Sequence, residues 1–203
     1  KAGNPIGALV EFYDNGNRKI EGSYGTTLND AQRQRQEGSW KEWFENGQQS
    51  IDATYDDGRL TGPYSEWYPN GKKHYETHYV ISGHKSEMMD GMTREWYEDG
   101  QLQSEGAYTT GLRDGLWKEY FEDGTLMSEA IYDRSKPSGA VTIYYPSGKM
   151  RFRGSYEVAG RRKYRTGHWV EYFANGNEQS EGEYINNKKQ GRWREWYEEG
   201  GVK

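Results

Sequence analysis

The chain has 203 residues, a formal net charge of −5 at pH 7 and a hydrophobic content of 32%, with a mean hydropathy of −1.23. The absence of cysteine excludes disulfides and thiolate metal sites, and the negative charge disfavours general nucleic-acid binding, which needs a basic surface. No run approaches the roughly 20 apolar residues of a membrane-spanning helix and no secretory signal pattern occurs. We therefore expect a soluble protein, whose compartment stays open between cytoplasm and periplasm or cell envelope.

A composition this polar is also typical of disordered chains. The aromatic content of 15% indicates order instead, because Phe, Tyr and Trp side chains each bury a large apolar area. We expect an ordered fold with a thin core.

An internal repeat runs through the chain, and its clearest stretch is GSWKEWFENG at 38–47. This stretch returns as GLWKEYFEDG at 115–124, GHWVEYFANG at 167–176 and GRWREWYEEG at 191–200. Repeats decide the fold before any other feature. Eight copies open at Gly7, Gly38, Gly62, Gly91, Gly115, Gly139, Gly167 and Gly191.

The base period is 24 residues. Three intervals are longer, which places insertions within 25–37, 80–90 and 157–166. The last copy stops before its second strand. We interpret residues 1–203 as a single array of about 24-residue repeats.

Each copy is predicted to fold as a β-hairpin. With the opening glycine as position 0, an aromatic-rich strand covers positions 1–7 and a second strand covers positions 10–17. The turn residues are Asn-Gly in four copies and Asp-Gly in two, which favours a type I′ turn with φ > 0 at both central residues. We predict two-residue turns and no helix.

The side chains fit the register that such a turn dictates. Position 6 would pair with 11, position 4 with 13, position 3 with 14 and position 2 with 15. Opposite charges then face each other at positions 3 and 14, and Trp faces a small residue at positions 2 and 15. The charged pairs are Lys41 with Asp52, Arg94 with Glu105 and Lys118 with Glu129, and the size-matched pairs are Trp40 with Ala53, Trp117 with Ala130 and Trp169 with Gly182.

Because side chains alternate along a strand, one face of the sheet should carry positions 2, 4, 6, 11, 13, 15 and 17. The other face should carry positions 3, 5, 12 and 14. Stacked hairpins add two strands per repeat, or about 10 Å. The predicted fold is all-β, an elongated single-layer solenoid of stacked β-hairpins.

Two copies, GMTREWYEDGQLQSEGAYTTGLRDG from Gly91 and GLWKEYFEDGTLMSEAIYDRSKPSG from Gly115, resemble the bacterial MORN-repeat variants, whose unit is GxWxEYYxNGxLxxEGxYxxGxxxG. The resemblance covers nearly the whole chain. It implies a non-enzymatic scaffold, and some proteins of the YwqK type are antitoxins or immunity proteins. MORN repeats in general are linked to protein scaffolding and to membrane lipids.

Position 5 carries an aromatic residue in every copy. On an uncovered sheet this stripe would be open to a partner protein or a glycan. The alternative is that these side chains only cover their own sheet. The stripe consists of Phe12, Trp43, Trp67, Trp96, Tyr120, Tyr144, Tyr172 and Trp196.

The insertion at 157–166 carries a basic cluster in an acidic protein. We interpret it as a site for an anionic group on a partner, a phosphate or a lipid head group; the alternative is a solvated charge run. Its residues are Arg161, Arg162, Lys163, Tyr164 and Arg165. The preceding repeat replaces two acidic positions by Ile143 and Arg153, which makes residues 139–167 the least regular part of the array.

No catalytic residue, metal site or cofactor is predicted. His74 and His78 would lie about 13 Å apart on one strand face, too far to share a metal, and nucleophile and phosphate-loop motifs are absent. Position 4 carries a recurring Glu that we interpret as structural, each carboxylate accepting hydrogen bonds from neighbours. These residues are Glu11, Glu42, Glu66, Glu95, Glu119, Glu171 and Glu195.

Two functions follow as hypotheses. The first is a non-enzymatic protein-binding scaffold of the immunity or antitoxin type, which binds and neutralises a toxin. The second is a membrane- or envelope-associated scaffold that recognises anionic lipid or glycan. Because neither terminal copy has a recognisable polar cap, end-to-end self-association is also expected.

Overall fold

The computed structural model describes residues 7–25, 35–83, 86–160 and 162–203. Over these residues the chain forms strands and turns and contains no α-helix. The chain divides into two compact units, residues 1–101 and 102–203. Residues 26–34, 84–85 and 161 lie outside the described residues. The insertions at 25–37 and 80–90 are therefore described only in part, and the basic cluster is described without Arg161.

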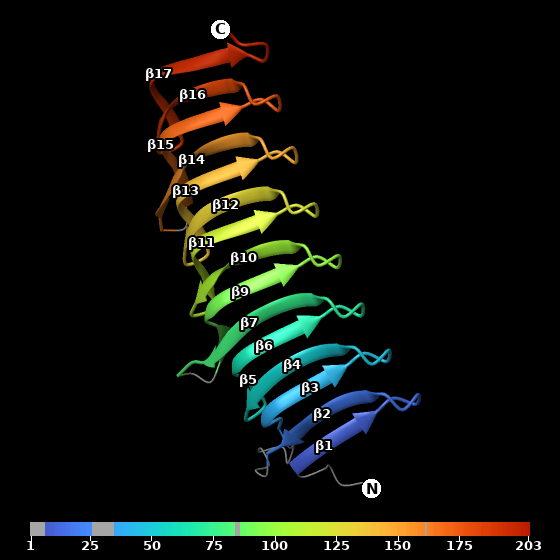
Figure 1. Ribbon diagram of the computed structural model, residues 1–203. Coiled ribbons are helices and arrows are strands. Elements are labelled where there is room, and N and C mark those ends of the chain that lie inside the picture. The colour runs from blue at the N-terminus through green and yellow to red at the C-terminus, as the bar shows by residue number, and fades with distance from the viewer. Residues whose placement is uncertain (1–6, 26–34, 84–85, 161) are drawn as a thin grey trace. The chain divides into compact units, whose positions relative to one another are not determined.

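Each unit is one antiparallel sheet of hairpins (Figure 1). In the first unit the long strands pair in chain order, and the short strands β5 and β8 pair with the ends of β4 and β7. The strands of this unit are β1 (Gly7–Phe12), β2 (Arg18–Tyr24), β3 (Gly38–Trp43), β4 (Gln49–Asp56), β5 (Arg59–Leu60), β6 (Gly62–Trp67), β7 (Lys73–Ile81), β8 (Glu87–Met89) and β9 (Gly91–Trp96).

In the second unit every strand pairs with the next along the chain. The predicted all-β fold of stacked hairpins is confirmed. The strands are β10 (Leu102–Thr109), β11 (Leu112–Tyr120), β12 (Leu126–Asp133), β13 (Lys136–Tyr144), β14 (Met150–Ala159), β15 (Arg162–Tyr172), β16 (Glu178–Ile185), β17 (Lys188–Tyr197) and β18 (Gly201–Val202).

The predicted register is confirmed over most of each hairpin. Trp117 pairs with Ala130, Lys118 with Glu129 and Glu119 with Ser128. The same repeat positions pair between β3 and β4 and between β15 and β16.

Near the turn the prediction was wrong. The amide of Gly124 donates to Phe121 O at 2.9 Å, and Gly124, with φ of 82°, is the one residue of this turn at positive φ. This is a type I turn closed by a glycine bulge, which uses Asn-Gly as readily as a type I′ turn does. Position 5 therefore pairs with position 11, as in Tyr120 with Leu126, and position 6 belongs to the turn.

Type I′ turns occur instead between the repeats. Both central residues have positive φ at 57–58, 110–111, 134–135 and 186–187. The insertion at 157–166 also connects paired strands, because Ala159 pairs with Arg162 and Glu157 pairs with Tyr164. It lengthens the β14–β15 hairpin and is not a loop.

Hydrogen bonds connect the glycine-bulge turns of neighbouring repeats. The position-6 hydroxyl donates to the last strand carbonyl of the next repeat, from Tyr13 to Trp43 O at 2.7 Å and from Tyr145 to Tyr172 O at 2.9 Å. Asn15 Nδ2 donates in the same direction, to Glu45 O at 2.9 Å. These bonds satisfy carbonyls that the strands leave unpaired.

The core lies on the face that carries position 2, here called the tryptophan face. Trp40, Trp117 and Trp169 are buried there to 3%, 3% and 1% exposure. Each ring meets Tyr side chains of position 17 edge-on, as Trp169 does with Tyr156 at 5.2 Å and Tyr184 at 5.9 Å between centroids. Aromatic pairs of this geometry stabilise a layer that has no covering helix.

The Trp rings fill space left by glycines of the preceding repeat. A Cβ on Gly154 would lie 2.2 Å from Trp169, and one on Gly22 would lie 2.2 Å from Trp40. Gly106 and Gly182 stand in the same relation to Trp117 and Trp193. The predicted pairing of Trp169 with Gly182 is correct as a backbone register, but the ring's own space comes from the repeat before it.

The irregular sixth repeat has a structural cause. Ile143 pairs with Phe152, and both pack against the buried cluster of Ala130, Val141 and Trp169. Phe152 stacks on Trp169 with ring centroids 5.7 Å apart. The replacement of Glu by Ile at position 4 therefore extends the core.

Candidate partner-binding surface

The stripe residue is the last residue of a strand in every repeat except the eighth, where β17 continues one residue past Trp196. Trp43, Trp67 and Trp96 are the last residues of β3, β6 and β9 in the first unit. In the second unit Tyr120, Tyr144 and Tyr172 end β11, β13 and β15. All six are half-buried, on the face of positions 3, 5 and 14, here called the stripe face.

The bulge at the turn brings position 11 onto the stripe face, where the simple alternation did not place it. Lys73 Nζ lies 5.9 Å from the ring centroid of Trp67 and 5.7 Å from that of Trp96. The guanidinium of Arg18 lies 5.8 Å from the Trp43 ring. Cations at these distances are attracted by the negative face of an indole, so each of the three first-unit tryptophans of the stripe has a cation against its ring.

A charge cluster fixes the lysine between the two tryptophans. Lys73 Nζ donates to Glu76 Oε2 at 2.7 Å, and Arg94 Nη1 donates to Glu76 Oε1 at 3.0 Å. Burial raises the pKa of Glu76, but the hydrogen bonds from Lys73 and Arg94 outweigh burial and hold the pKa below its ordinary value. Two cations thus share one carboxylate beside two half-buried indoles.

Glu76→Gln should lower the free energy of unfolding at pH 7, and this deficit should shrink in acid. A carboxyl whose folded pKa is depressed contributes stability above its ordinary pKa of 4.5. That contribution is lost as the pH falls through the lower folded pKa. Urea unfolding of both proteins at pH 7 and at about pH 3 measures the change; a deficit that grows in acid would contradict the assignment.

A hollow of about 320 Å³ adjoins this cluster on the first unit. Pro63 and Met92 bring apolar groups to it and His78 brings an imidazole ring, and Met92 is 51% exposed. Glu76 and Arg94 line both the hollow and the charge cluster. The hollow and the stripe therefore form one continuous surface, here called the paired-tryptophan site: Pro63, Trp67, Lys73, Glu76, His78, Met92, Arg94 and Trp96.

In the second unit the stripe has different chemistry. The Tyr120 hydroxyl donates to Glu105 Oε1 at 3.3 Å, and the Tyr144 hydroxyl donates to Glu129 Oε1 at 3.5 Å. Burial raises the pKa of both tyrosines, and the neighbouring carboxylates raise it further. Sequence reasoning treated the stripe as uniform, but its polar partners are cations in one unit and carboxylates in the other.

The basic cluster separates into two parts. Arg165 belongs to the tryptophan face, 4.6 Å from the Trp169 ring and 3.6 Å from Glu171 Oε1. Arg113 and Lys189 hold the same place before Gly115 and Gly191, so Arg165 is part of the repeat's own packing. Of the remaining described residues, Arg162 and Lys163 are exposed and Tyr164 is half-buried.

The position-4 carboxylates are hydrogen-bonded as expected. Trp40 Nε1 donates to Glu42 Oε1 at 2.8 Å, and Ser128 Oγ donates to Glu119 Oε2 at 3.1 Å. The Tyr64 hydroxyl donates to Glu66; burial and this carboxylate raise the pKa of Tyr64. Structural hydrogen bonds thus account for Glu42, Glu66 and Glu119.

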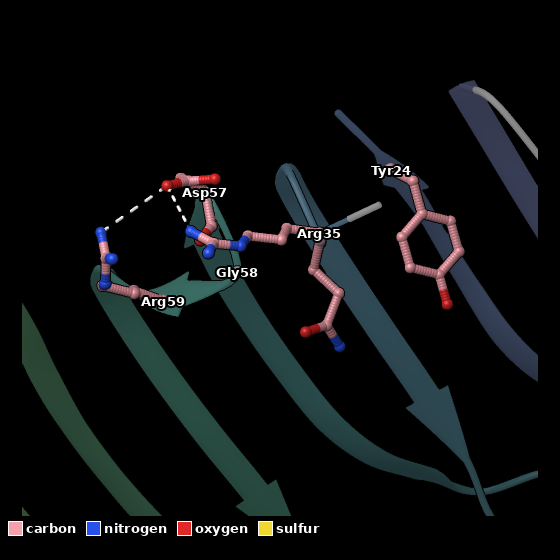
Figure 2. A pocket seen from close by; sticks show the side chains of 6 residues that line it. Tyr24, Arg35, Asp57, Gly58 and Arg59 are labelled. Atoms are coloured by element: carbon pink, nitrogen blue, oxygen red, sulfur yellow. Dashed lines mark hydrogen bonds and ion pairs between the residues drawn. The ribbon is translucent and has the colours of Figure 1, made fainter. Parts of the chain in front are cut away.

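A polar pocket of about 540 Å³ lies beside the first insertion (Figure 2). Arg35 Nη1 and Arg59 Nη1 approach Asp57 Oδ2 from two sides, at 2.6 Å and 3.8 Å. The amide of Asp57 donates to Glu37 Oε2 at 3.0 Å, which adds a second acid. The two guanidinium groups are balanced by two carboxylates. Their ion pairs and hydrogen bonds hold the turn at 57–58 in place.

Within the described part of the chain, no group of three or more His, Asp or Glu residues is placed to hold a metal ion. The described part contains no α-helix and so no helix that could cross a membrane.

The family model described as MORN repeat variant matches six segments of the chain, residues 36–57, 60–80, 89–109, 113–134, 137–157 and 165–186. Among solved structures, a chain in the crystal structure of TcdB2-TccC3-Cdc42 aligns with 96% of this chain at 15% identity, with a TM-score of 0.21. This chain spans 13% of the length of that one. The search of curated proteins found no match.

Proposed function

Because this chain belongs to the MORN repeat variant family, we propose that it is a non-enzymatic repeat scaffold that binds another protein through the paired-tryptophan site. The observation that carries the proposal is Lys73 held against both Trp67 and Trp96 on an uncovered sheet face. Trp and Arg are the residues that most often dominate protein interfaces.

The site has the parts that a protein interface needs. The hollow at Pro63, His78 and Met92 can receive an apolar side chain, and the two indoles offer flat apolar area. Lys73 and Arg94 supply donors that Glu76 holds in place. Side chains fixed before binding lose less conformational entropy when a partner arrives.

We further propose that the partner is a toxin and that binding neutralises it. The resemblance to immunity and antitoxin proteins with this repeat supports the proposal. So does the shape of the site: a half-buried aromatic face with a shallow hollow suits occlusion of another surface better than turnover of a small substrate.

Capture from lysate of the source cell, with the intact chain as bait, should recover the partner, and its affinity can then be measured by calorimetry. Trp67→Ala and Trp96→Ala should each weaken binding by roughly 2 kcal/mol, or about thirtyfold, with weak salt dependence. Trp196→Ala, at the same repeat position in the second unit, is the matched control and should leave binding unchanged. Unchanged affinity in both first-unit variants, with thermal stability retained, would refute the site.

A further inference from the structure

A second surface lies where the inter-repeat turns of the second unit end their hairpins. The first residue after the turn is a cation in three successive hairpins: Lys136 pairs with Asp133, Arg162 with Ala159 and Lys188 with Ile185. These turns lie at the strand ends opposite the glycine-bulge turns (Figure 1). This row of strand ends is here called the edge.

Hydrogen bonds to the backbone join these hairpin ends to one another. Lys136 Nζ donates to Gly160 O, which joins the first end to the second. The amide of Arg165 donates to Asn187 Oδ1 at 2.6 Å, and the amide of Asn187 donates to Arg165 O at 3.1 Å, which joins the second to the third. The three hairpin ends that carry these cations therefore stand at set places along one edge.

The edge is basic although the chain is acidic. Over the described residues of 133–136, 157–163 and 185–188, five cations stand with only Asp133 and Glu157 as acids. None of Lys136, Arg162 and Lys188 lies within salt-bridge distance of a described carboxylate, and all three are exposed. The cations are Arg134, Lys136, Arg162, Lys163 and Lys188.

Strand geometry sets the spacing of this row. Each hairpin adds two strands, so equivalent residues lie about 9.6 Å apart. The β14–β15 hairpin is longer by two residues on each strand, an even number, so Arg162 points to the same side as Lys136 and Lys188. Tyr164 occupies the level of the two lysines on that hairpin, with Arg162 about 7 Å further out.

We infer that this edge binds an acidic protein segment in the polyproline II conformation, with a carboxylate at every third residue. Polyproline II advances 3.1 Å per residue and has three residues per turn, so side chains three apart share one face about 9.3 Å apart. Such a segment places successive carboxylates at Lys136, at the Tyr164 hydroxyl and at Lys188, with the Arg162 backbone about 7 Å outward of the middle place. Proline between the acids packs on the Tyr164 ring.

The test uses the intact chain and a fluorescent peptide of five Glu-Pro-Pro triplets, with binding followed by anisotropy. A peptide of the same composition with its five Glu in one block is the spacing control. The triplet peptide should bind more tightly than the block peptide, and its affinity should fall as salt rises from about 0.05 M to 0.5 M.

The double variant Lys136→Gln/Lys188→Gln should weaken triplet binding about tenfold, since each exposed charge pair contributes modestly. Lys149→Gln/Arg151→Gln removes the same charge from the opposite end of the β13–β14 hairpin and should have no effect. Tyr164→Phe should weaken binding less than the lysine pair does. Thermal melts confirm that all variants are folded.

Equal affinity for triplet and block peptides would overturn the inference, because the row would then act as unspecific charge. Binding to phosphatidylcholine vesicles containing about one-third phosphatidylserine, without binding to the triplet peptide, would overturn it in favour of a lipid surface. Equal loss in both double variants would overturn the location.

Discussion

Gly154→Ala should destabilise the second unit by about 3 kcal/mol, the upper end of the usual cost of overpacking. The new methyl would lie 2.2, 2.3 and 2.7 Å from three ring atoms of Trp169. That ring is 1% exposed and is held by Tyr156, Tyr184 and Phe152, so it has no free space to move into. Urea unfolding followed by Trp fluorescence measures the loss.

The preceding repeat supplies the control. Ala130 holds the equivalent place, and it faces Val141 of the next repeat, which is smaller than a tryptophan. Ala130→Gly should therefore cost only about 1 kcal/mol. Trp169→Val should partly rescue Gly154→Ala, with a coupling energy of at least about 1 kcal/mol in the double-mutant cycle; additive losses would show that the ring is not the obstacle.

Ile143→Glu should destabilise the second unit by about 3 kcal/mol at pH 7, because it places a carboxylate in the apolar cluster around Trp169. Elsewhere in this unit the position-4 Glu has a cation beside it, Arg113 at 3.4 Å from Glu119 and Lys189 at 3.3 Å from Glu195. In the sixth repeat Pro137 takes the place of that cation.

The loss should depend on pH. Burial would raise the folded pKa of the introduced carboxyl above its unfolded value. The charge penalty is then absent below the unfolded pKa and grows as the pH rises toward the folded one. Unfolding at pH 7 and at about pH 4 should show the smaller deficit in acid, and Pro137→Arg with Phe152→Ser should recover stability at pH 7. A deficit independent of pH and of these partners would mean that shape alone is responsible.

The repeat predicted the strand register because both hairpin strands lie within one copy. Alternating charge and size at positions 2, 3, 14 and 15 report directly on cross-strand neighbours, and the pairs Lys41 with Asp52 and Trp117 with Ala130 were found as predicted. The turn type was not predictable in this way, since Asn-Gly suits two turns that differ by one bulged residue.

That one residue decided the chemistry of the candidate site. It moves position 11 to the stripe face and brings Lys73 to Trp67 and Trp96. The stripe could be predicted because every copy has an aromatic residue at position 5. The cation between the indoles could not, because it depends on the bulge and on the distance between separate repeats.

The glycine and tryptophan pairs have a consequence for how such an array can change. Glycine stands at position 15 wherever the next copy brings Trp40, Trp117, Trp169 or Trp193, and a larger residue stands there where the next copy brings Tyr64, Thr93 or Val141. A copy moved to a new neighbour would meet either a methyl group or an empty space. Gene duplication or recombination within this array therefore preserves this packing only when each glycine stays with the tryptophan that follows it. The unit that can be copied intact thus begins and ends inside the sequence repeat, between one opening glycine and the next.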